Sequence, residues 1–184
     1  MLKRTVAGLV VLGMLAAPAW AFRRLELGQA VEGLRFETLD RREFGLEEVA
    51  GAKATVIAFW ASWSPRSARV LADLGDWYGR WGDRGLGALA VNVDHETWGK
   101  DEVNALARYM AEHDVRVPAA VDWNLDLYDR FGVTVVPSLV LLDANGVVSH
   151  ALGGYSDMGR EEFWAAVARA LGLDPDCPGR GDCL

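Results

Sequence analysis

The sequence predicts an α/β fold in which helices flank a mixed central sheet and an N-terminal β-hairpin precedes it. A continuous run rich in branched and aromatic residues at 54–60 is typical of a strand that is buried on both faces, and residues 86–93 are expected to form another buried strand. Stretches with apolar residues three or four positions apart follow these runs, and strands that alternate with helices form a parallel sheet core. Two short apolar segments around a turn at 143–146 add antiparallel strands.

The elements are expected in the following order along the chain. The hairpin uses residues 34–39 and 43–46. The first helix follows the first long strand, with Ser64 as its cap residue and Pro65 at its first position. A second helix starts at Thr97. The later elements are a strand at 118–121, a short helix at 125–131, strands at 138–142 and 147–152, and a helix at 161–171.

Composition and charge favour a globular domain and argue against several classes of binding protein. Hydrophobic residues make up 51% of the 184 residues and charged residues 24%, which is typical of a globular domain and not of a disordered chain. The formal net charge is −7 and no basic cluster is present, so we expect neither nucleic acid nor anionic lipid as a main partner. The two cysteines, Cys177 and Cys183, lie near the end of the sequence, which argues against a multi-cysteine metal site.

Residues 1–21 have the pattern of a secretory signal peptide. Lys3 and Arg4 precede a short apolar run, and Ala19-Trp20-Ala21 matches a small-x-small cleavage site. We predict cleavage after Ala21, with an uncleaved anchor as the alternative, and no membrane span in the remaining chain. The protein is therefore expected in the periplasm or outside the cell, where disulfides persist.

Three motifs resemble the TlpA/ResA family of thioredoxin-fold proteins. The segment FWASWSPRS at residues 59–67 resembles the family's active-site strand, loop and helix start. The segment FGVTVVPS at 131–138 resembles the loop that carries the family's cis-proline, and LLDANGVV at 141–148 resembles its late hairpin. The resemblance implies a thioredoxin-like domain over residues 22–172, followed by a tail at 173–184.

The family's activity is thiol–disulfide exchange, and the residues needed for it differ here. By resemblance, Ser64 and Ser67 occupy the positions of the two redox cysteines, and a serine cannot form a disulfide. A serine at this place caps the helix instead, which is worth about 1 kcal/mol relative to alanine. Val70 stands where related proteins often carry an acidic residue. These replacements favour a protein that has lost catalysis.

Asp94, His95 and Glu96 follow the strand at 86–93 and are expected near Ser64, because loops at the carboxyl ends of strands share one rim in an α/β sheet. Two other chemistries are therefore candidates at this place. Ser64 is a candidate hydrolase nucleophile if His95 comes within reach, but no nucleophile-elbow motif is present. Asp94, His95 and Glu96 are candidate metal ligands, although three adjacent residues rarely converge on one ion. A solvated loop is the favoured interpretation of these residues, and we expect neither a metal ion nor a cofactor.

A binding role needs no thiol. In the resembling family, the backbone before the cis-proline pairs with an extended partner segment, and Val136 before Pro137 is that residue here. Trp63 and Pro65, beside the helix start, are the other candidate binding residues. We expect Trp63 to be the most exposed member of an apolar patch with Trp60 and Pro137, although a core position is the favoured interpretation of Trp60.

The favoured function is therefore a non-catalytic binding or scaffold module that engages a protein or an extended peptide. One alternative is a thiol–disulfide oxidoreductase that uses Cys177 and Cys183, and another is an engineered Cys-to-Ser form of an ordinary oxidoreductase. For the tail cysteines, a small structural disulfide is the first choice and a redox pair the second.

Overall fold

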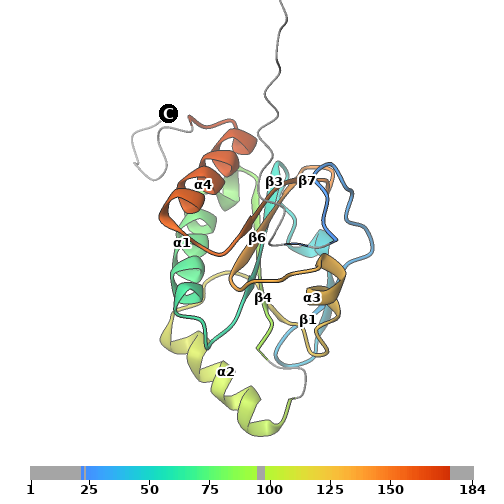
Figure 1. Cartoon of the computed structure of the whole chain (residues 1–184), viewed down its shortest axis with the longest axis vertical. Coiled ribbons are helices and arrows are strands. Elements are labelled where there is room, and N and C mark those ends of the chain that lie inside the picture. Colours follow the sequence, from blue (N-terminus) through green and yellow to red (C-terminus); the bar gives the residue numbers. More distant parts are fainter. Residues whose placement is uncertain (1–21, 23, 95–97, 175–184) are drawn as a thin grey trace, which may run out of the picture.

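The predicted thioredoxin-like fold is confirmed. The computed structural model describes residues 22, 24–94 and 98–174, and in that part of the chain a five-stranded mixed sheet has the order β5-β4-β3-β6-β7 (Figure 1). β3 runs parallel to β4 and β4 to β5, whereas β6 is antiparallel to both β3 and β7. The strands of this sheet are β3 (Ala54–Trp60), β4 (Leu86–Asn92), β5 (Ala119–Val121), β6 (Ser138–Asp143) and β7 (Val148–Gly153).

The N-terminal hairpin forms a separate two-stranded sheet. β1 (Arg35–Glu37) pairs antiparallel with β2 (Glu43–Gly45), and Phe36 lies opposite Phe44. The predicted hairpin is confirmed, and both phenylalanines are buried against one face of the large sheet, so the hairpin packs on the domain. A short 3-10 helix, η1 (Leu46–Glu48), leads from the hairpin towards β3.

The helices form layers on the two faces of the large sheet. α1 (Pro65–Trp81) and α4 (Asp157–Leu171) lie side by side on one face, and the short α3 (Asp126–Phe131) lies on the other with the hairpin (Figure 1). α2 (Lys100–Glu112) lies at one end of the molecule, below the α1–α4 layer in that view. A second 3-10 helix, η2 (Gly82–Arg84), ends α1.

α1 is held firmly against α4. The indole rings of Trp77 and Trp164 stack at 4.7 Å between centroids. The Asp73 carboxylate accepts from Arg160 Nε at 2.6 Å and from the Tyr155 hydroxyl at 2.7 Å. The Tyr155 hydroxyl in turn accepts from Trp164 Nε1 at 2.7 Å. This network fixes α1, and with it the loop that precedes α1.

Two helix starts differ from the prediction. α4 begins at Asp157, four residues before the predicted start, because Ser156 is its cap and accepts a hydrogen bond from Gly159 N. The described part of α2 begins at Lys100 after Gly99 as cap residue, whereas the predicted start at Thr97 lies outside the described residues. Among the residues that the structure describes, no helix is long and apolar enough to cross a membrane.

Candidate functional site

Three connections meet at one end of the large sheet. β3 and β4 are in parallel register, so Trp60 and Asn92 end side by side, and the loops that follow them share one edge. β6 runs the other way and pairs Ser138 with Phe59, which brings Pro137 to the same edge. The register thus gathers the loop before α1, the residues after β4, and the loop before β6.

The loop before α1 is held by backbone hydrogen bonds and by Ser67. Ser64 N donates to the Ala61 carbonyl at 3.1 Å, and Ser67 N donates to the Ser64 carbonyl at 2.9 Å. The Ser67 hydroxyl, which is fully buried, accepts from Ala61 N at 3.2 Å. Ser67 therefore fixes the path of the chain from β3 into α1.

Ser64 occupies the predicted cap position, but the prediction that its hydroxyl accepts a capping hydrogen bond is wrong. Its backbone is extended, and its hydroxyl makes no capping hydrogen bond. Pro65 has no N–H to offer, and the N–H of Ser67, the usual partner of a cap oxygen, is bonded to the carbonyl of Ser64. The hydroxyl of Ser64 thus has no structural task in α1, although the residue is buried.

Asp94 joins the loop after β4 to the loop before α1. Its carboxylate Oδ1 accepts from Ser62 N at 2.6 Å, and Asp94 N donates to Asn92 Oδ1 at 3.2 Å. The expectation that Asp94 approaches this loop is confirmed, whereas His95 and Glu96 lie outside the described residues. Within the described ranges, no group of three or more His, Cys, Asp or Glu residues is arranged to hold a metal ion.

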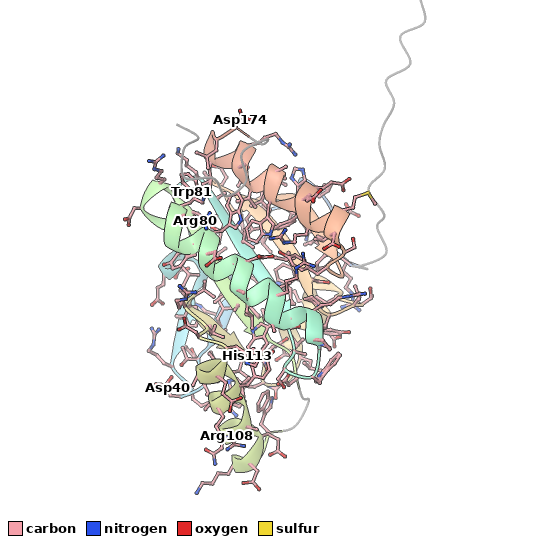
Figure 2. The ribbon with its side chains drawn as sticks, turned by 90° about the vertical axis from the view of Figure 1, so that its left-hand side faces the viewer. Asp40, Arg80, Trp81, Arg108, His113 and Asp174 are labelled. Carbon is pink, nitrogen blue, oxygen red and sulfur yellow. The ribbon has the colours of Figure 1, made fainter. Side chains whose placement is uncertain are left out.

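The charge of Asp94 reaches the underside of α2. Burial raises the pKa of the Tyr109 hydroxyl, and the negative charge of Asp94 raises it further. The ring of Tyr109 stacks between Trp60, at 5.5 Å, and His113, at 3.9 Å. Figure 2 shows His113 at the end of α2 that lies nearer the body of the molecule, and Arg108 lower on the same helix. Asp94, Trp60 and α2 therefore belong to one neighbourhood.

The loop before β6 leaves part of its backbone unpaired. The Val136–Pro137 peptide bond is cis. The hydroxyl of Ser138 donates to the Val135 carbonyl at 2.6 Å, and Gly154 N donates to the Pro137 carbonyl at 2.8 Å. In the described part of the chain, neither the N–H nor the C=O of Val136 has a hydrogen-bond partner. An extended segment can pair with both groups.

Three exposed apolar side chains surround this edge, and we call them the rim patch: Trp63, Val135 and Met158. They are 63%, 39% and 72% exposed. Met158 comes to the edge because Gly154 is bonded to the loop before β6 and Asp157 pairs with Arg69 of α1 at 2.7 Å. Sequence analysis identified Trp63 and missed the other two, because nothing in the residues themselves marks Val135 or Met158 as exposed.

The core position favoured for Trp60 is confirmed, whereas Pro137, which was expected in the apolar patch, lies inside the protein. Trp60 is completely buried and Pro137 is also buried, so neither adds to the exposed surface. Pro65, the other candidate, is exposed at the start of α1, beside Trp63. Cys177 and Cys183 lie outside the described residues.

Comparison with known proteins places this arrangement in a family. A family model described as AhpC/TSA matches residues 27–151 of the 184-residue chain. The chain belongs to the AhpC/TSA family. One curated relative, the thiol-disulfide oxidoreductase ResA of Halalkalibacterium halodurans, is 23% identical over 141 residues, 76% of this chain and 76% of its own length. The ResA of Geobacillus thermodenitrificans is 24% identical over 159 residues, 84% of this chain and 87% of its own.

Solved structures share the fold of this AhpC/TSA protein. A putative thiol:disulfide interchange protein DsbE from Chlorobium tepidum has a TM-score of 0.67 at 21% identity, covering 80% of this chain and 99% of its own. A putative protein disulfide isomerase from Bacteroides thetaiotaomicron has a TM-score of 0.68 at 14% identity, covering 83% and 93%. The predicted TlpA/ResA-like resemblance is thereby confirmed at the level of family and fold.

Proposed function

We propose that this protein is an extracytoplasmic thioredoxin-like module that binds an extended polypeptide without thiol–disulfide exchange. The binding surface comprises the rim patch, Pro65 and the free backbone of Val136. Residues 1–21 are proposed to direct the chain out of the cytoplasm and to be removed after Ala21.

The residues at the start of α1 support a non-catalytic role. The relatives named above are called thiol-disulfide oxidoreductases, and such exchange needs a thiolate that attacks a disulfide. Ser64 and Ser67 stand where we place the two thiols, and the loop contains no cysteine. Ser67 has a structural task, because its buried hydroxyl accepts from Ala61 N.

The observation that carries the proposal is the coincidence of the rim patch with unpaired backbone. Three of the four large apolar side chains that are exposed in the described residues lie around the edge where Val136 offers a free N–H and C=O. A bound strand gains affinity from main-chain pairing and specificity from alternate side chains that contact apolar surface. Trp63 is the strongest candidate anchor, because tryptophan dominates the energetics of many interfaces.

The experiment is a peptide-binding measurement on the mature protein. A library of extended peptides of ten residues is screened by fluorescence anisotropy, and the best binder is measured with Trp63→Ala and with Trp81→Ala, a matched control at the far end of α1. We expect Trp63→Ala to weaken binding by about tenfold or more and Trp81→Ala to leave it unchanged. Equal effects of the two variants would contradict the proposed surface.

A second candidate function follows from the names of the relatives. The only cysteines of the chain are Cys177 and Cys183, so any dithiol chemistry would have to use them. A redox titration with thiol alkylation separates the two functions. A midpoint below about −300 mV indicates a structural disulfide, and a midpoint between about −270 and −120 mV indicates an exchange catalyst.

A further inference from the structure

Three neighbouring side chains lie on one face of the sheet, at the edge where Tyr109 of α2 stacks on Trp60. Trp60 ends β3, Asn92 ends β4 beside it, and Trp123 follows β5. Trp60 and Trp123 belong to the same apolar cluster on the α1–α4 face. Asn92 comes two residues after Ala90 of that cluster, so its side chain is on the same face. Val121 pairs with Asn92 and places Trp123 near the same edge.

Each of these side chains carries a buried N–H group without an acceptor. In the described part of the chain, Trp60 Nε1, Asn92 Nδ2 and Trp123 Nε1 are the buried side-chain nitrogens that lack a hydrogen-bond partner. Trp60 and Asn92 are completely buried, and Trp123 is 6% exposed. Buried donors are almost always paired, because an unpaired one loses its water without replacement. Three such donors together at the functional edge point to an acceptor that binds there.

The helix above these donors is only lightly held. Leu106 is its one fully buried residue, Val103, Tyr109 and Met110 are only partly buried against the core, and in the described ranges no ion pair joins α2 to another element. Its contacts with the donor residues are made by aromatic rings: Tyr109 stacks on Trp60, and Trp98, just before α2, meets the ring of Trp123 edge-on at 5.0 Å. Aromatic rings are weak acceptors. Elements with few buried apolar contacts open more readily than a core does.

We propose that α2 is a movable cover, and that Trp60, Asn92 and Trp123 donate hydrogen bonds to main-chain carbonyls of an extended polypeptide bound beneath it. The inference rests on the proposed function and extends the same surface from the rim patch to the floor under α2. It also assigns the chemistry of the segment. The floor offers neutral donors and aromatic walls, with the Asp94 carboxylate at its Asn92 end and the Arg41 guanidinium over the Trp123 ring at 3.4 Å. At the Asn92 end, an uncharged segment is therefore favoured over an acidic one.

The first test measures the opening of α2 in the unbound protein by hydrogen exchange of its backbone amides. Asn92→Leu keeps the side-chain shape and removes the unpaired donor, so it favours the closed form and should slow exchange of α2 about fivefold or more. Trp123→Phe removes another donor without touching the Asn92–Asp94 hydrogen bond and should act in the same direction. Asn124→Leu is the control, because it makes the same Asn-to-Leu change at an exposed position. It should leave the exchange rate of α2 unchanged. If neither Asn92→Leu nor Trp123→Phe slows α2, the proposal is wrong.

The second test uses a capped, uncharged seven-residue peptide of alternating valine and serine as the probe. The probe should bind the wild type and speed exchange of α2 severalfold, and Asn92→Leu should weaken its binding about tenfold. A probe whose two aspartates lie at the Asn92 end should bind more weakly, and Asp94→Asn should remove that difference. Binding that depends on Trp63 but leaves α2 exchange unchanged overturns this inference and leaves the proposed function intact. If no probe or library peptide binds the wild type, both fail.

Discussion

Replacing Ser67 with alanine is expected to destabilise the fold much more than replacing Ser64, although both serines stand at the start of α1. The Ser67 hydroxyl is fully buried and accepts a hydrogen bond from Ala61 N, which is itself fully buried. Ser67→Ala leaves that N–H without a partner and without access to water. The hydroxyl of Ser64 makes no capping bond, so Ser64→Ala removes no interaction that holds α1.

The magnitudes follow from these contacts. A buried donor left unpaired costs about 1–3 kcal/mol, and the loss of one hydroxyl from a packed site adds little to that. We therefore expect Ser67→Ala to lower the free energy of unfolding by about 2 kcal/mol. Ser64→Ala should change it by less than about 0.5 kcal/mol, below the ~1 kcal/mol that a working cap contributes.

The assay is urea unfolding of the mature protein, monitored by far-UV circular dichroism and by tryptophan fluorescence. The two variants serve as controls for each other, because they make the same chemical change three residues apart. If the variants share the same dependence of the unfolding free energy on urea and differ only in the midpoint concentration, the difference is one of stability alone. A larger loss for Ser64→Ala than for Ser67→Ala would refute the hydrogen bonding described for this loop.

Further predictions concern the α1–α4 clamp and the site. Asp73→Ala should lower the free energy of unfolding by about 2–4 kcal/mol in the same urea assay. The substitution leaves the partly buried Arg160 guanidinium and the Tyr155 hydroxyl without the carboxylate to which both donate. Burial first, and then the bond to Asp73, raise the pKa of Tyr155, so its neutral form stabilises the fold below the unfolded pKa of about 10. Above that pH the wild type should lose stability by about 1.4 kcal/mol per pH unit relative to Tyr155→Phe, and parallel pH profiles would contradict this. Ser64→Cys with Ser67→Cys should create a dithiol that reduces insulin in a turbidity assay, whereas either single replacement should not.

Much of the fold could be predicted from the sequence because its signals are local. The run at 54–60 is apolar except for Thr55 and rich in branched and aromatic residues, which favours a strand buried on both faces, and β3 has those bounds. α4 began earlier than predicted because its first turn is polar, with Met158 exposed, so hydrophobic periodicity starts only further along. Ser156 was the available signal for that start, as a cap residue.

The site was only partly predictable because it depends on contacts between distant residues. The sequence placed Asp94 near the loop before α1, since strand ends in a parallel sheet share an edge. It could not show that Ser67 and not Ser64 would bond the loop, because the carbonyl of Ser64 takes the N–H that its hydroxyl would need. Nor could the sequence reveal that the side-chain N–H groups of Asn92 and Trp60 lack acceptors, because that depends on which residues pack around them in the folded protein.

The central claim is that the rim patch binds an extended polypeptide and that no thiol takes part. The most direct measurement compares peptide affinity among the wild type, Trp63→Ala, and a double variant with Cys177→Ser and Cys183→Ser, all under oxidising and reducing conditions. We expect the double variant to bind as the wild type does in both conditions, and Trp63→Ala to bind about tenfold more weakly. Loss of binding in the cysteine variant, with binding by Trp63→Ala unaffected, would contradict the claim and show that peptide binding depends on Cys177 and Cys183.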